Sequence, residues 1–216
     1  MSHDNELKSA VLAELKWEPS VDAAHIGVTA KDGVITLMGH VGSFVEKYAA
    51  EMATGRVKGV KAVAEEIEVR LPFSIKHDDE AIATAAVNRL TWNSSVPRDA
   101  IKVKVEKGWV TLTGTVEWSY QKNAAAQDLR WLAGVVGVSN NITIKPRVNT
   151  ANISDDITHA LHRSWFFDPQ TVFVTADGGR VKLTGTVDTW YDRQTAGATA
   201  WAAPGTTAVE NDIRVS

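Results

Sequence analysis

The chain has 216 residues, 44% of them hydrophobic, and a formal net charge of -3, a composition typical of a globular protein. It contains no cysteine, which excludes disulfides, thiolate metal sites and thiol nucleophiles. No stretch approaches the roughly 20 apolar residues of a membrane-spanning helix, and the small net charge does not favour nucleic-acid binding, so neither is predicted.

The amino-terminal residues predict an amphipathic helix. Leu7, Val11 and Leu15 recur at helical spacing and lead to Trp17. Charged residues are spread along this segment, whereas a secretion signal has a basic start followed by an apolar block. As written, the chain is therefore predicted to be cytoplasmic, with peripheral attachment to a membrane as the alternative.

A hairpin is predicted after this helix. Ile26 and Val28 alternate with polar residues, as in a half-buried strand, and a second alternating run ends at Val41. Between them stands Asp32-Gly33, where the glycine suits the positive φ of a tight turn.

An alanine-rich helix and a last strand complete the pattern. The helix contains Lys47-Tyr-Ala-Ala-Glu-Met-Ala and is followed by Gly59, which suits a left-handed helix cap. Alternation then resumes with Val63, Ile67 and Val69. The order of elements is αββαβ.

The whole pattern occurs three times. The motif Gly-x-(Val/Ile)-x-Leu-x-Gly-x-Val recurs with its first glycine at Gly33, Gly108 and Gly179, spacings of 75 and 71 residues. We therefore predict three tandem modules at residues 3–71, 77–146 and 152–216. The repeated glycines, predicted at hairpin turns, strand ends and helix caps, are Gly33, Gly39, Gly59, Gly108, Gly114, Gly134, Gly179, Gly185 and Gly205.

The element order also predicts the architecture of each module. A hairpin followed by a crossover helix returns the third strand parallel to the second. The fold class is therefore α+β, with a three-stranded mixed sheet and two helices on one face of it.

This pattern resembles the BON domain, named for bacterial osmotic-stress and nodulation proteins. The last strand of the second copy, Val138-Ser-Asn140-Asn-Ile142, is closest to the family, and the third copy keeps Asn211. The first copy departs from it by placing Glu65 at that position.

The resemblance implies a non-enzymatic module of bacterial stress and envelope proteins. Members are commonly described as attaching to phospholipid surfaces, and some are implicated in potassium binding. Three hypotheses follow: binding of anionic phospholipid or of an envelope protein, mainly through the second module; potassium binding or sensing; and a structural scaffold that forms homo-oligomers.

The uneven charge of the copies favours the second module for lipid binding. Residues 73–147 carry a net charge of +3, and the segments before and after carry -3 each. Alternation places Lys102, Lys104 and Trp109 on the sheet face opposite the helices, where they suit an anionic membrane surface. Alternatively, this face packs against a neighbouring module.

Other aromatic residues are secondary candidates. Trp17, Trp92 and Phe167 share a position at the end of the first helix and are predicted to cover each core, with Trp92 also a candidate lipid contact. The lipid-binding candidates in the loop that enters the second helix, with ordinary packing as the alternative, are Trp118, Trp190 and Tyr191.

Catalytic and metal motifs are not found. The chain has no nucleophile elbow, phosphate-binding glycine loop or zinc-protease helix, so we predict no enzyme and no cofactor. His159 and His162 have the spacing of a metal pair but lack a third ligand, which favours a solvated helix face and no metal. The acids at the starts of the first helices are predicted to be caps and helix-dipole partners: Asp4, Asp78, Asp79, Asp155 and Asp156.

Overall fold

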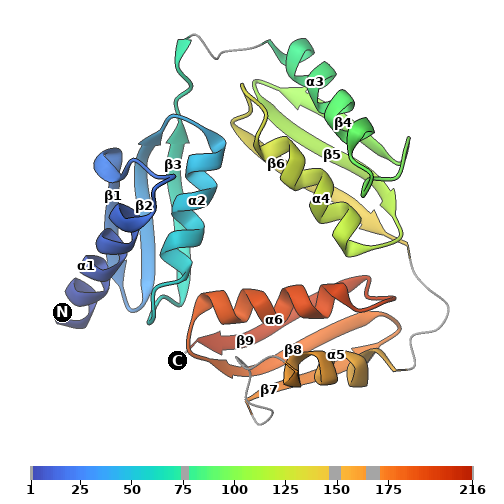
Figure 1. The fold of residues 1–216 in the computed structure, drawn as a ribbon. Helices are drawn as coiled ribbons and strands as arrows, with labels where there is room; N and C mark the ends of the chain where they lie inside the picture. Colours follow the sequence, from blue (N-terminus) through green and yellow to red (C-terminus); the bar gives the residue numbers. More distant parts are fainter. Residues whose placement is uncertain (1, 74–77, 146–151, 164–170, 216) are drawn as a thin grey trace. The chain divides into compact units, whose positions relative to one another are not determined.

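Three similar modules make up the chain. The computed structural model describes residues 2–73, 78–145, 152–163 and 171–215. Each module has its own three-stranded sheet, with the strands in chain order (Figure 1). The predicted α+β class and the αββαβ order are confirmed.

The elements are as follows. The first module contains α1 Ser2–Trp17, the 3-10 helix η1 Ala23–His25, β1 Ile26–Lys31, β2 Val34–Val41, α2 Phe44–Gly55 and β3 Ala62–Val69. The second contains α3 Asp79–Trp92, β4 Ile101–Glu106, β5 Trp109–Val116, α4 Ser119–Arg130 and β6 Gly137–Ile144. The third contains α5 Ile153–His162, β7 Val172–Asp177, β8 Arg180–Val187, α6 Trp190–Ala202 and β9 Ala208–Val215.

The sheets are mixed, as predicted. In the second module β4 and β5 pair antiparallel, and β5 and β6 pair parallel. The third module repeats this arrangement with β7, β8 and β9. The crossover through α4 or α6 returns the last strand to the sheet beside the second strand.

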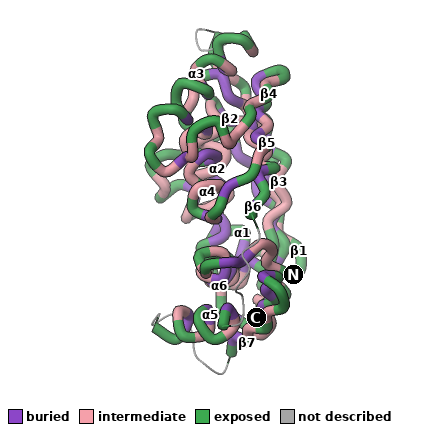
Figure 2. The backbone as a smooth tube through the Cα atoms, turned by 90° about the vertical axis from the view of Figure 1, so that its right-hand side faces the viewer, coloured by how far each residue is buried: buried purple, intermediate pink, exposed green. Residues whose placement is uncertain are grey.

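The core of each module lies between the helices and one face of the sheet. Val110 and Leu112 on β5 are fully buried, whereas their neighbours Trp109 and Thr113 are exposed, so burial alternates along the strand (Figure 2). Ala125 on α4 is also fully buried, and its small side chain lets the helix lie close to the sheet.

The hairpin turns have the predicted glycine conformation. Lys107 and Gly108 have φ of 51° and 76°, and Asp32 and Gly33 have φ of 53° and 84°. Positive φ at both central residues defines a type I′ turn, whose twist matches that of the flanking strands. The corresponding residues of the third module, Gly178 and Gly179, also have positive φ.

The second glycine of the motif lies inside a strand, not at a strand end as expected. Gly114 is the partner of Ile101, the first residue of β4, and has φ of 139°. A Cβ at this position would lie 2.1 Å from the carbonyl oxygen of Ala100. Two backbones therefore approach here more closely than any side chain would allow.

The third glycine of each repeat was wrongly assigned to a helix cap. Helix α6 ends at Ala202, and the amide of Thr206 then donates to the carbonyl of Ala203 at 3.2 Å. This turn has Pro204 and Gly205 at its centre, with Gly205 at φ 92°. Proline followed by a glycine of positive φ is the sequence of a type II turn, so the glycine reverses the chain after the helix has ended.

Two acids at the first-helix starts, Asp4 and Asp79, lie in the first turn of their helices as predicted and have a further role that was not predicted. Asp78 caps α3 as expected and accepts from the amide of Ala81 at 2.7 Å. Asp79 also accepts from the amides of Lys107 and Gly108, at 2.8 and 2.9 Å. A carboxylate on the first helix therefore holds the hairpin turn of the same module.

The first module uses the same tether, and the third helix start differs. Asp4 accepts from the amide of Asp32 in the hairpin turn at 3.0 Å. Asp155 and Asp156 are exposed in the first turn of α5, where a negative charge suits the helix dipole as predicted.

The Asp79 tether can be tested by mutation. We expect Asp79→Ala to lower the free energy of unfolding of the second module by about 1–3 kcal/mol, because two backbone amides lose a charged acceptor. Amide exchange of Lys107 and Gly108 should accelerate in the same variant. Asp156→Ala removes an acid from the same part of another first helix, and it should change unfolding by less than about 0.5 kcal/mol. Equal effects of the two substitutions would contradict the tether.

Candidate functional site

The asparagine of the last strand is a structural residue. The Asn140 side-chain amide donates to the carbonyl of Lys122 on α4 at 2.8 Å, and its oxygen accepts from the amide of Ile142 at 3.3 Å. Asn211 makes the same two contacts, to Arg193 and Ile213. The side chain thereby ties the last strand to the second helix.

Glu65 performs part of this role in the first module. Its carboxylate accepts from the amide of Ile67 at 2.7 Å, which reproduces the contact within the strand. The tie to the helix becomes an ion pair with the Lys47 ammonium at 2.8 Å. Although the first copy has glutamate in place of asparagine, its last strand is therefore still tied to its second helix, through an ion pair.

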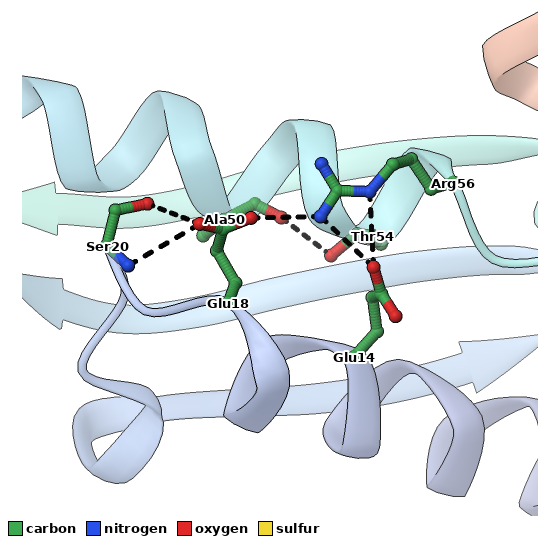
Figure 3. A network of polar contacts seen from close by, with 6 residues as sticks. All are labelled: Glu14, Glu18, Ser20, Ala50, Thr54 and Arg56. Atoms are coloured by element: carbon green, nitrogen blue, oxygen red, sulfur yellow. Dashed lines mark hydrogen bonds and ion pairs between the residues drawn. The ribbon is translucent and has the colours of Figure 1, made fainter.

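Another polar cluster joins the two helices of the first module. The Arg56 guanidinium donates to Glu14 at 3.0 Å and to Glu18 at 2.9 Å, and Glu18 also accepts from Ser20 (Figure 3). The hydrogen bond from Ser20 and then that from Arg56 hold the pKa of Glu18 below its usual value. Every group in this cluster has a partner, which indicates a clamp between the C-terminal end of α1 and the residue that follows α2.

The open face of the second sheet carries the main candidates where the sequence placed them. Lys102 and Lys104 are exposed on β4 and Trp109 is exposed on β5. Lys104 pairs with Glu106 two residues further along the strand, at 2.9 Å. We define Lys102, Lys104 and Trp109 as the basic face of the second module.

Trp109 lies flat on this face. Its indole N–H donates to the hydroxyl of Ser139 on β6 at 2.9 Å. A Cβ on Gly137 would lie 2.4 Å from the indole ring, so the ring covers that glycine. The side chain is 46% exposed, but its position is fixed by the neighbouring strand.

The equivalent face of the third module is neutralised by acids. Lys182 on β8 forms ion pairs with Asp212 at 2.7 Å and Glu210 at 2.9 Å on β9. Its pKa is raised, first by the hydrogen bond to Asp212 and then by that to Glu210. In the second module the positions of Glu210 and Asp212 are taken by the uncharged Ser139 and Asn141. The basic face therefore has no carboxylate on its last strand.

The helix-end tryptophans do not cover the cores, and that prediction was wrong. Trp17 is 83% exposed and Trp92 is 88% exposed. Each is the last residue of its helix, where a side chain can point past the end of the sheet instead of onto it. Phe167, at the third equivalent position, lies outside the described residues.

The remaining aromatic candidates are at the starts of the second helices. Trp118 is the N-cap residue of α4, is half-buried, and has its ring 6.4 Å from that of Tyr120. Trp190 and Tyr191 are the first two residues of α6, so the prediction that they lie in a loop was wrong. Tyr191 is exposed.

A partly apolar hollow in the second module was not anticipated. It lies between α3 and β4 and has a volume of about 140 Å³. Its lining includes the apolar residues Val87, Leu90, Ile101 and Val103 and the charged residues Arg98 and Asp99. Alternation predicted that Ile101 and Val103 lie under the helices, but the structure leaves both side chains only half-buried beside the hollow.

The histidine pair lies on an exposed helix side, as the solvated-face interpretation predicted. His159 and His162 are both exposed on α5. Within the described residues, no three His, Cys, Asp or Glu side chains are grouped as metal ligands. The same part of the chain contains no helix that is both long and apolar enough to span a bilayer.

Comparison with known proteins finds two similar sequences and a weakly similar solved structure. The chain is 28% identical over 146 residues to Osmotically-inducible protein Y of Escherichia coli, covering 66% of this chain and 73% of that protein. It is also 28% identical over 146 residues to Outer membrane lipoprotein DolP of Haemophilus influenzae, covering 64% and 68%. A solved structure of CdsD, a structural protein of the Type III secretion system of Chlamydia trachomatis, aligns over 98% of this chain and 92% of that one with 19% identity and a TM-score of 0.27.

The family comparison is decisive because it covers all three repeats. The BON domain matches residues 3–70, 78–146 and 149–216. These matches coincide with the three sheets and with the glycine and asparagine positions whose geometry is described above. The chain belongs to the BON domain family and carries three copies of the domain in tandem.

Proposed function

We propose that this protein is a non-enzymatic BON-domain protein that associates peripherally with anionic phospholipid surfaces, mainly through its second module. The observation that carries the proposal is the basic face, where Lys102, Lys104 and Trp109 are exposed beside a last strand without carboxylates. The names of its relatives, one induced by osmotic stress and one a lipoprotein of the outer membrane, support a role at the bacterial envelope.

Electrostatics favour the second module over its neighbours. Residues 73–147 carry a net charge of +3, and the two flanking segments carry -3 each. A basic residue close to an anionic leaflet contributes about 1 kcal/mol of attraction, and salt screens it. Lys104 already has an exposed carboxylate partner in Glu106, so we expect Lys102 to contribute more than Lys104.

The apolar part of the interaction is assigned to Trp92. Its indole is the most exposed of the three tryptophan candidates in this module, because Trp109 is held against Ser139 and Gly137 and Trp118 is half-buried. Residues of the same helix line the hollow beside β4, together with Arg98. Indole rings partition to the headgroup region of a bilayer, where an arginine can bind phosphate.

Charge reversal on the basic face tests the proposal. We expect Lys102→Glu/Lys104→Glu to weaken binding to phosphatidylglycerol vesicles at least tenfold in co-sedimentation, because two attractive charges become repulsive. Lys8→Glu/Lys16→Glu makes the same charge change at exposed positions of α1 and should have a much smaller effect. Equal binding to phosphatidylglycerol and phosphatidylcholine vesicles would overturn the proposal and favour an envelope protein as partner.

The helix-end tryptophans form a matched pair for a second test. We expect Trp92→Ala to reduce vesicle affinity about three- to tenfold, because one interfacial indole is lost. Trp17→Ala removes an equally exposed indole from the equivalent position of the acidic first module and should leave affinity unchanged. The measurement is a vesicle titration of each full-length variant, and equal losses would refute the assignment to the second module.

The remaining hypotheses stay predictions. Among the described residues, no group of side chains supports potassium binding. For the location, the relatives' names favour the envelope over the cytoplasm.

A further inference from the structure

The outer edges of the three sheets differ in how they are protected. Strands β3, β6 and β9 each form one edge of their sheet. An edge strand presents unpaired backbone groups that another strand can pair with, and proteins usually block this with charged side chains or covering groups. Two such protections present on β3 and β9 are missing from β6.

The first missing protection is charge. Strand β3 contains Glu65, Glu66 and Glu68, and β9 contains Glu210, Asp212 and Arg214. Strand β6, with the sequence Gly-Val-Ser-Asn-Asn-Ile-Thr-Ile, has no charged residue.

The second missing protection is a basic side chain from the crossover helix. In the first module, the Lys47 ammonium donates to the carbonyl of Ile67 on β3 at 2.7 Å. In the third, Arg193 donates to the carbonyls of Ile213 and Asn211 on β9, at 2.9 and 2.5 Å. These groups occupy carbonyls that a neighbouring strand would need.

Lys122 holds the same position in the second module but does not cover its strand. Within the described residues, its ammonium has neither a hydrogen bond nor an ion pair, although its backbone carbonyl accepts from Asn140. The side chain is half-buried, and this desolvation lowers its pKa. The carbonyls of β6 therefore lack the cover that β3 and β9 receive.

We propose that β6 is a dimerisation edge, which pairs antiparallel with β6 of a second copy of this chain to form a continuous six-stranded sheet. The second copy fits because an uncharged strand meets no like charge when placed against itself, whereas β3 would oppose its own glutamates. The side chains of Ser139, Asn141 and Thr143 share one face of β6, and they are short and uncharged, so they would bring no like charges together across the junction. A two-fold axis makes such an interface self-complementary.

Sedimentation velocity of the full chain tests the dimer. The test variant replaces two residues of β6 with the residues at the equivalent positions of β3. Asn141→Glu/Thr143→Glu introduces the residues that β3 has at these positions, Glu66 and Glu68. We expect the unmodified chain to dimerise with concentration and the variant to dimerise at least tenfold more weakly. Asn123→Glu/Gln127→Glu adds the same charge to the exposed side of α4 and should leave the dimer intact.

Cross-linking provides a measurement independent of these charge variants. Because the chain has no cysteine, a single cysteine at Ser139, Asn141 or Thr143 reports contact between copies. We expect oxidation to give covalent dimers most readily at the position nearest the two-fold axis, and not with Asn123→Cys. A chain that is monomeric at all concentrations, or a dimer unaffected by Asn141→Glu/Thr143→Glu, would overturn the inference. A chain that stays monomeric at all concentrations but still binds phosphatidylglycerol vesicles would overturn the dimer and leave the proposed function intact.

Discussion

Each module has two helices to cover a three-stranded sheet, and its buried core lies on only one face of that sheet. This constraint determines what the rest of the molecule can do. The covered face supplies stability through Val110, Leu112 and their equivalents, and the opposite face and the edges are left to other uses. In the second module the open face is basic, in the third its lysine is neutralised by acids, and the edges differ in their protection.

The sequence predicted the fold well because its signals are local. Strands show apolar residues at every second position, helices show them at every third or fourth, and tight turns show glycine, so each element can be recognised from nearby residues. The exposed position of Lys102 and Lys104 follows from the alternation in their strand alone. Contacts between distant segments were not predictable in this way. The partner of Asp79 lies 28 residues away in the hairpin turn, and the direction of Trp92 depends on where α3 ends relative to the sheet.

The repeats show which contacts the domain requires and which it can exchange. All three keep a side chain that binds the amide two residues further along the last strand, whether it is Asn140, Asn211 or Glu65. The partner on the second helix differs with the side chain: the asparagine binds a backbone carbonyl of the helix, and Glu65 binds the Lys47 ammonium. Three copies in one chain can therefore preserve one scaffold and diverge in their surfaces.

The indole of Trp109 connects two of these surfaces. It belongs to the basic face, yet it rests on Gly137 and is hydrogen-bonded to Ser139, both on the edge strand. Any side chain larger than hydrogen at position 137 would lift the ring and alter the face and the edge together. A substitution on the edge strand at this point would therefore change the basic face as well.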